Sequence, residues 1–102
     1  MALALPVKLN GYNIVAIVNT GSAGVVISKS CYDCLWMNCD EEVEFTITSA
    51  TDTNKKLRKV LFSVEVTVGS HTVTVPAIVL EGLHFSMLLG VSWLKEAKAR
   101  IW

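Results

Sequence analysis

Hydrophobic residues recur along the chain in short runs, and the spacing within these runs is typical of β-strands. Apolar side chains alternate with others over residues 5–9, and residues 12–18 form a largely apolar run rich in β-branched residues. Asn10-Gly11 separates the two runs, and Asn-Gly in this setting is the strongest short signal for a hairpin with a type I′ turn. The sequence therefore predicts a β-hairpin with Asn19 at the end of its second strand.

A second hairpin is predicted in the middle of the chain. Residues 42–48 and residues 57–68 both alternate with one apolar face, and the polar residues 49–56 between them are predicted to form a loop at the tip. Further extended segments are expected at residues 25–27, 71–75, 77–80 and 85–89, and residues 100–102 are expected to begin a last strand. Pro76 limits ladder pairing where it interrupts one of these segments.

Two segments have the pattern of helices. A short helical turn is expected over residues 31–37, with Ser28 or Ser30 as its N-cap. Residues 93–99 are good helix formers, and Ser92 before them can serve as a cap. Many short strands with one longer helix near the C-terminus predict an all-β fold, either a barrel or a folded sheet.

Composition narrows the classes of protein to consider. The 102 residues are enough for one domain with a single core, and 52% of them are hydrophobic, so part of the surface is expected to be covered by a partner. No apolar run approaches the length of about 18 residues that spans a bilayer, and the first residues do not resemble a signal peptide. We therefore expect no membrane partner.

Charge argues against a small β-barrel that binds nucleic acid. Nine basic and nine acidic residues give a net charge of zero. The basic residues clustered at positions 55–59 have no interleaved aromatic residues for base stacking, so they are interpreted as part of a polar loop tip. We expect no nucleic-acid partner.

Three cysteines lie close together in the sequence, at Cys31, Cys34 and Cys39. Their odd number, without a signal sequence, indicates reduced thiols in a cytosolic setting. Their spacing matches part of a zinc knuckle, but His71 and His84 are too distant in sequence to suggest a fourth ligand. No metal or cofactor is expected, and no Cys–His spacing indicates a cysteine nucleophile.

Two short motifs separated by about 70 residues carry a family resemblance. The apolar run that ends in Asn19-Thr20-Gly21-Ser22 is followed far downstream by Leu88-Leu89-Gly90 and a helical pattern. This arrangement resembles the retropepsin-like aspartic proteases, which include retroviral and retrotransposon proteases and the protease-like domain of DNA-damage-inducible proteasome shuttle proteins. The resemblance extends from Leu5 to Ile101. One departure is conspicuous, because Asn19 stands where the family has its catalytic aspartate.

The resemblance implies a small closed or folded β-barrel of retropepsin type, with a short C-terminal helix and a flap hairpin over the cleft. Residues 1–102 would then be a single domain that forms one half of a homodimeric protease. By the same resemblance, the catalytic loop is Asn19, Thr20 and Gly21, and the packing support beneath it is Leu88, Leu89 and Gly90. The floor of the substrate cleft is Ser22, Ala23 and Gly24. The tip of the flap, which would contact the substrate, is Ala50, Thr51, Asp52, Thr53 and Asn54. An extended peptide or polyprotein segment would bind as an added strand.

Aspartic proteolysis needs two carboxylates that share one proton, so that one acts as acid while the other activates water. One motif per chain implies a dyad built across a two-fold axis. A carboxamide at Asn19 cannot take up that proton, so the chain as written is expected to be inactive. The intact Thr-Gly-Ser that follows favours an engineered Asp-to-Asn change. The alternative is a natural, non-catalytic module for peptide binding or dimerisation, and either would work in the cytoplasm or within a virus-like particle.

Overall fold

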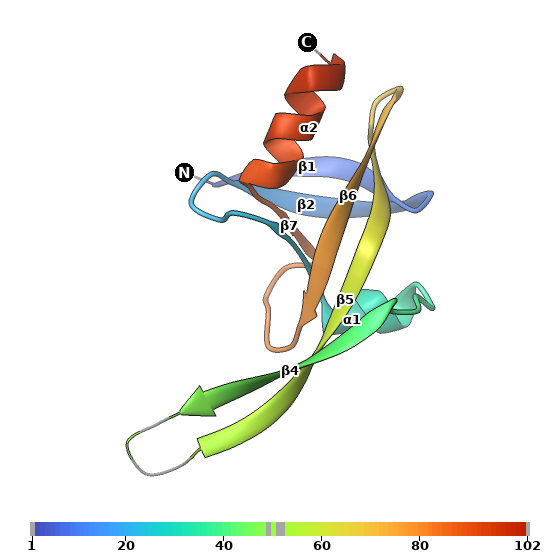
Figure 1. The fold of residues 1–102 in the computed structure, drawn as a ribbon. Coiled ribbons are helices and arrows are strands. Elements are labelled where there is room, and N and C mark those ends of the chain that lie inside the picture. The colour runs from blue at the N-terminus through green and yellow to red at the C-terminus, as the bar shows by residue number, and fades with distance from the viewer. Residues whose placement is uncertain (1, 49, 51–52, 102) are drawn as a thin grey trace.

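The structure is a computed structural model that describes residues 2–48, 50 and 53–101. Within these residues the chain forms seven strands and two helices (Figure 1). They are β1 (Ala2–Leu9), β2 (Tyr12–Asn19), β3 (Val25–Ser28), α1 (Lys29–Cys34), β4 (Glu41–Thr48), β5 (Thr53–Val68), β6 (His71–Leu80), β7 (Met87–Leu89) and α2 (Val91–Ile101).

Six of the strands close into a barrel. Neighbouring strands follow the order β1, β2, β7, β3, β6 and β5, and β5 pairs with β1 to complete the ring. The first hairpin has the predicted geometry, because Asn10 and Gly11 both have positive φ, at 48° and 89°, as a type I′ turn requires. The predicted all-β barrel with a C-terminal helix is thus confirmed.

Asn10 closes the barrel as well as making the turn. In the described chain β1 and β5 share two paired positions, Lys8 with Thr67 and Leu9 with Val66. Beyond them the Asn10 N–H donates to the Glu65 carbonyl oxygen at 2.8 Å, and the Glu65 N–H donates to Asn10 Oδ1 at 2.8 Å. These two hydrogen bonds lengthen the short pairing between β1 and β5. Asparagine can make both, because it tolerates the left-handed backbone of the turn and its side chain still offers an acceptor.

The barrel interior is filled by side chains that alternate along each strand. The buried apolar residues are Val7, Leu9, Ala16, Val25, Ile27, Leu61, Val64, Val66, Val73, Val75, Ala77, Val79, Met87 and Leu89. Helix α2 packs against β6 and β7, and it buries Trp93 and Ala97, which lie one helical turn apart on the same face. None of the helices in the described part of the chain is long and apolar enough to cross a membrane.

A β-bulge lies opposite Pro76. Strand β6 continues through this proline, but the register with β5 shifts between Leu61, opposite Ala77, and Val64. Proline has no N–H for the ladder, and β5 has one extra residue here instead of a continuous pairing, since two of its residues lie opposite Pro76. The freed N–H of Phe62 donates to Asp40 Oδ2 at 2.7 Å, which gives this backbone group a partner outside the sheet.

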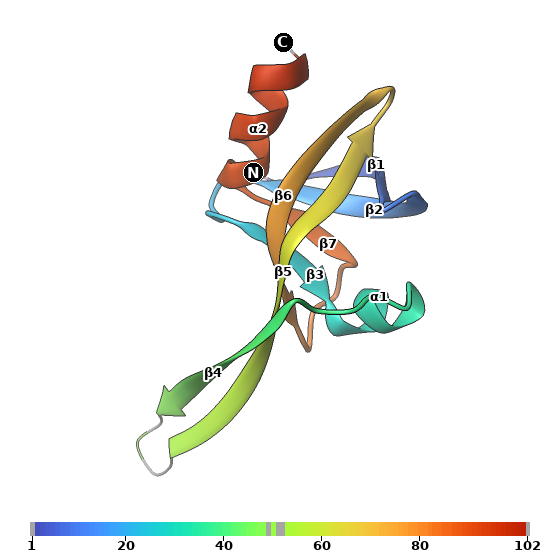
Figure 2. The ribbon, with the colours of Figure 1, turned by 45° about the vertical axis from the view of Figure 1, so that its right-hand side comes forward.

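The second hairpin is longer than predicted. Strand β5 already begins at Thr53, which pairs with Thr48 of β4, so the predicted loop at residues 49–56 is too long, and positions 49, 51 and 52 lie outside the described residues. Polar residues were a poor indicator of a loop here, because pairing with β4 gives the backbone of this segment its partners. A salt bridge of 2.6 Å between Lys59 Nζ on β5 and Glu42 Oε1 on β4 joins the two strands of this hairpin near its base. Figures 1 and 2 show the ribbon extending away from the barrel.

Both helices differ in extent from their predictions. Helix α1 begins directly after Ser28, whose Oγ accepts the Cys31 N–H at 3.1 Å, so Ser28 rather than Ser30 is the cap. Helix α2 begins at Val91, so Ser92 lies inside it and is not a cap. The predicted last strand is wrong for residues 100–101, which continue the helix because no glycine or proline stops it, and residue 102 is not described.

Candidate active site

The loop between β2 and β3 is held by a turn centred on Asn19, the last residue of β2. Its Oδ1 accepts the Gly21 N–H at 2.8 Å, and its main-chain oxygen accepts the Ser22 N–H at 3.2 Å. A Cβ at residue 21 would lie 3.1 Å from Asn19 Oδ1, so glycine allows this side-chain oxygen its close approach. The local turn therefore fixes where the polar head of residue 19 sits.

The first turn of α2 fastens the other side of the loop. The Val91 N–H donates to the Ser22 carbonyl oxygen at 2.8 Å, and the Ser92 N–H donates to the Ala23 carbonyl oxygen at 2.9 Å. The first amides of a helix have no partner within it, so these loop carbonyls take the place of a side-chain cap. Figure 1 shows the loop beside the start of α2.

Gly90 makes this close approach possible. A Cβ on Gly90 would lie 2.3 Å from the Gly24 carbonyl oxygen and 2.5 Å from that of Ser22. Strand β7, which leads into Gly90, pairs with β2 and with β3, the two strands that carry the loop. Leu89 is fully buried and Leu88 is partly exposed. The structure thus brings the two sequence motifs together.

An apolar row crosses the outer face of the barrel beside the loop. It consists of directly paired residues from five strands, Ile17, Leu88, Val26, Ile78 and Val60. Each is partly exposed, and the residues on either side of Leu88, Val26 and Ile78 in their strands are buried in the core. A row of half-covered aliphatic side chains next to a polar loop is suited to bind the apolar side chains of a ligand.

A cavity of about 500 Å³ lies between the loop and this row. None of the described residues that line it is charged. They are Ser22, Ala23, Gly24, Val25, Val26, Val60, Pro76, Ala77, Ile78 and Ser92. The motif indicated the three loop residues, but the other strands are brought in by tertiary pairing, for which the sequence carries no local signal.

Of the remaining predicted residues, Thr20 lies exposed in the loop directly after Asn19, which is partly buried. Ala50 and Thr53 of the predicted flap tip are exposed, and Asn54 lies in β5. Thr51 and Asp52 lie outside the described residues. The contact of this tip with a ligand therefore stays a prediction.

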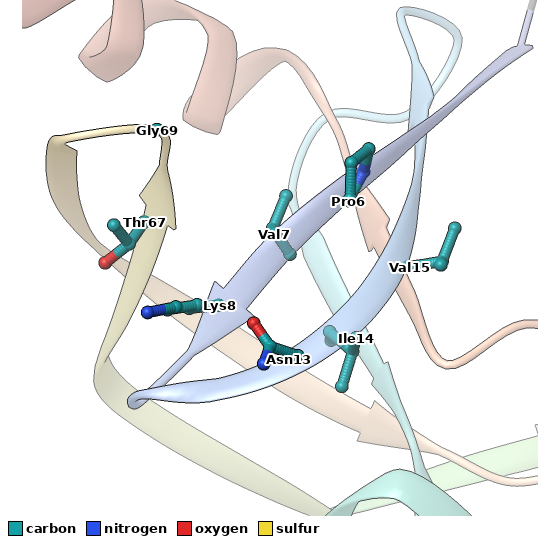
Figure 3. A pocket seen from close by; sticks show the side chains of 8 residues that line it. All are labelled: Pro6, Val7, Lys8, Asn13, Ile14, Val15, Thr67 and Gly69. Carbon is teal, nitrogen blue, oxygen red and sulfur yellow. The ribbon is translucent and has the colours of Figure 1, made fainter.

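A second cavity, of about 480 Å³, lies at the opposite end of β2 and was not foreseen from the sequence. Figure 3 shows its polar side, where Lys8 and Asn13 come from paired strands and Thr67 lies opposite Lys8 on β5. Its lining residues are Pro6, Val7, Lys8, Asn13, Ile14, Val15, Thr67 and Gly69. It is separate from the loop at Asn19.

The three cysteines are free thiols, two of them in α1 and the third shortly before β4. Cys31 is buried, Cys34 is exposed and Cys39 is partly buried. Burial raises the pKa of the Cys31 thiol, and the nearby Cys34 adds to this effect. Among the described residues, no group of three or more histidine, cysteine or acidic side chains could hold a metal ion.

Solved structures share this architecture. The retroviral protease-like domain of Ddi1 from Leishmania major matches with a TM-score of 0.68 and 12% identity, over 96% of this chain and 78% of that one. The EIAV protease, solved with the inhibitor HBY-793, matches with a TM-score of 0.67 and 13% identity, over 96% and 89%. A retropepsin-like aspartic protease from Rickettsia conorii matches with a TM-score of 0.65 and 18% identity, over 92% and 68%.

These matches confirm the retropepsin-like fold that the two motifs indicated. The sequence itself matches the model of one protein family, gag-polyprotein putative aspartyl protease, over residues 5–96. That match covers most of the chain, including the loop, the apolar row, both motifs and the first half of α2. The chain therefore belongs to the gag-polyprotein aspartyl protease family.

Proposed function

We propose that two copies of this chain assemble into an aspartic endopeptidase of retropepsin type, in which each copy contributes residue 19 to a shared dyad. The observation that carries this proposal is the loop itself. Asn19 is held by the Gly21 N–H at 2.8 Å on a loop that α2 fastens from behind. Thr20 is exposed next to it, where a second copy can be reached. In this proposal residues 1–102 form one domain, and Thr20 bonds to its symmetry mate.

The substrate in this proposal is an extended peptide or polyprotein segment. The apolar row offers half-covered aliphatic side chains beside the loop, and alternate side chains of an added strand would contact it. Ser22, Ala23 and Gly24 form the floor of the site, and the hairpin of β4 and β5 closes over the peptide. Such an assembly would act in the cytoplasm or within a virus-like particle.

Asn19 makes the chain inactive as written. Its carboxamide has nearly the shape of a carboxyl group, so the hydrogen bond from the Gly21 N–H and the ability to bind a peptide are both retained. It cannot act as the acid or the base that proteolysis requires. General acid–base catalysis contributes about 10²–10⁴ in rate, and the symmetric change removes both partners of the dyad. We propose that Asn19 is an engineered replacement of aspartate.

Replacement of Asn19 by Asp tests this function. The Asn19→Asp variant is expected to cleave peptides from a mixed library, with a pH-dependent rate and with inhibition by pepstatin. Asn13→Asp is a matched control, because it adds the same charge at the other end of β2. It is expected to stay inactive. A folded, dimeric Asn19→Asp variant that cleaves no peptide would contradict the proposed enzyme.

Assembly is tested separately by sedimentation at micromolar concentration. A dimer is expected, because each chain carries a single loop of the required kind. A strictly monomeric species that binds no peptide would contradict a site shared between two copies.

A second candidate function is favoured by Asn19 as it stands. If asparagine is the natural residue, the same dimer is a peptide-binding or dimerisation module derived from a protease. Restored cleavage in the Asn19→Asp variant supports the enzyme. Peptide binding without cleavage by a dimeric Asn19→Asp variant supports the module.

A further inference from the structure

The cavity at the far end of β2 combines one charged group with apolar side chains. Its volume is about 480 Å³, and of its described lining residues only Lys8 is charged. Figure 3 shows the Lys8 side chain extending from β1 towards Thr67 on β5. Within the described part of the chain, neither the Lys8 ammonium nor the Asn13 side chain has an ion-pair or hydrogen-bond partner. Both residues are exposed, so a ligand can reach them.

The polar groups of this cavity come from three neighbouring strands. Lys8 pairs with Asn13 of β2 on one side and with Thr67 of β5 on the other, so the three side chains point to the same face of the sheet. The Oγ1 atoms of Thr67 and Thr72 lie 2.8 Å apart. When the Thr72 hydroxyl donates to Thr67, the Thr67 hydroxyl keeps its own hydrogen for a ligand. The cavity thus offers an ammonium, an amide N–H and a hydroxyl, all of which are donors.

An apolar pair, Pro6 and Val15, lies beside these donors. The two residues are paired with each other, and each is two positions along its strand from Lys8 or Asn13, so they share the same outer face. Same-face positions along a strand are about 7 Å apart. Val15 is 55% exposed although its side chain is aliphatic. A ligand that has an anionic group and an apolar group next to it would therefore contact the donors and Val15 together.

We propose that this cavity binds a ligand with one carboxylate and an adjacent apolar group, either a small aromatic acid or a peptide that ends in a free phenylalanine. The carboxylate accepts hydrogen bonds from Lys8, Asn13 and Thr67, and the apolar group covers Pro6 and Val15. A carboxylate fits better than a phosphate monoester, whose charge is about −2, because the described lining offers a single cation. The site shares no residue with the loop at Asn19, so it does not rest on the proposed function.

The test is an NMR titration of the isotope-labelled chain with N-acetylphenylalanine, which carries one carboxylate and one aromatic ring. The backbone amide resonances of Lys8, Asn13, Val15 and Thr67 are expected to shift. N-acetylphenylalaninamide lacks the charge and N-acetylglycine lacks the ring, and each is expected to bind roughly three- to tenfold more weakly. Equal binding of the acid and its amide, or shifts confined to the loop at residues 19–24, would overturn the proposal.

Two variants test the contacts directly. Lys8→Gln is expected to weaken the binding of N-acetylphenylalanine by about three- to tenfold. Lys95→Gln is the matched control, since it removes the same charge from an exposed position of α2, and it is expected to leave the binding unchanged. Val15→Thr keeps the shape of the side chain and is expected to weaken the binding by about threefold. A Lys8→Gln chain that keeps the parent's folded spectrum and binds equally tightly would overturn the proposal.

A pentapeptide that ends in phenylalanine distinguishes the two sources of the ligand. If it shifts the same resonances and binds more tightly than N-acetylphenylalanine, the ligand is the end of a peptide chain. Equal or weaker binding identifies a small acid, and both results support a carboxylate site. An Asn19→Asp variant that cleaves no peptide would contradict the proposed enzyme and leave this site intact.

Discussion

Gly90 stands so close to Gly24 that a Cβ on residue 90 would lie 2.3 Å from the Gly24 carbonyl oxygen. The contact joins the start of α2 to the loop that carries Asn19. It coincides with two hydrogen bonds from the first helix amides to the same loop. The position of Asn19 therefore depends on a glycine about 70 residues further along the chain.

Gly90→Ala is expected to lower the free energy of unfolding by about 1–3 kcal/mol, because the added methyl meets two backbone oxygens that cannot move away cheaply. Gly24→Ala is the matched control, since a Cβ there meets no atom within 4 Å and the glycine does not have a positive φ. Urea denaturation measures both variants. Equal stabilities would show that the loop and α2 are not tightly joined.

The features that the sequence predicted correctly are local ones. The turn at Asn10-Gly11 follows from two residues that tolerate a positive φ, and the strands on either side follow from alternation over a few positions. The two motifs indicated which segments form the candidate site, because each motif is a short run of consecutive residues. Their juxtaposition came from the family resemblance and not from the pattern of the residues.

The features that the sequence did not predict arise from tertiary contacts. Serine is a residue type that favours the N-cap of a helix, so Ser92 was predicted to cap α2. The carbonyl oxygens of Ser22 and Ala23 already accept hydrogen bonds from the first N–H groups of α2, however, and the helix starts earlier, at Val91. The polar start of β5 gains its structure from pairing with β4 rather than from its own propensity. The bulge opposite Pro76 depends on a partner strand that no local window contains.

Leu88 and Leu89 are adjacent in β7, but Leu89 faces the barrel interior and Leu88 faces its outer surface. Substitutions at these two positions therefore separate effects on peptide binding from effects on stability. Leu89→Ala is expected to cost about 2–5 kcal/mol in the free energy of unfolding, because the side chain is fully buried. Leu88→Ala is expected to cost much less, since Leu88 is partly exposed in the apolar row. In the Asn19→Asp background, Leu88→Ala should lower kcat/KM by about tenfold or more. Unchanged peptide cleavage would contradict a binding role for the row.

The Asp40 carboxylate satisfies the Phe62 N–H at the β-bulge, at 2.7 Å. Asp40→Ala is expected to lower the free energy of unfolding by about 1 kcal/mol, because it removes this acceptor, whereas Asp40→Asn retains a side-chain oxygen and should lose less. Asp33→Ala is a useful comparison, since its ion pair with Lys29 lies on the surface and contributes little. If the alanine and asparagine variants at position 40 were equally stable, the side-chain acceptor would have no role in the bulge.

The free energy of unfolding is expected to fall as the pH becomes alkaline. Burial, with a hydrogen bond to Cys39 as a second cause, raises the pKa of the Tyr32 phenol. Burial raises the pKa of the Cys31 thiol, and the bond to Glu42 raises the pKa of Lys59. In each case the folded chain keeps a proton that the unfolded chain releases first. The stabilising effect is therefore complete below the unfolded pKa values and is lost as the pH rises from about 9 upward.

Urea denaturation under reducing conditions, repeated between pH 7 and pH 11, measures this loss. Tyr32→Phe should make the decline above about pH 10 less steep, because phenylalanine has no proton to release. Tyr12→Phe is the matched control, since Tyr12 is 56% exposed on the first hairpin, and its profile should follow that of the parent chain. A parent profile that stays level up to pH 11, or a Tyr32→Phe profile as steep as the parent's, would show that the buried phenol does not contribute to the alkaline loss of stability.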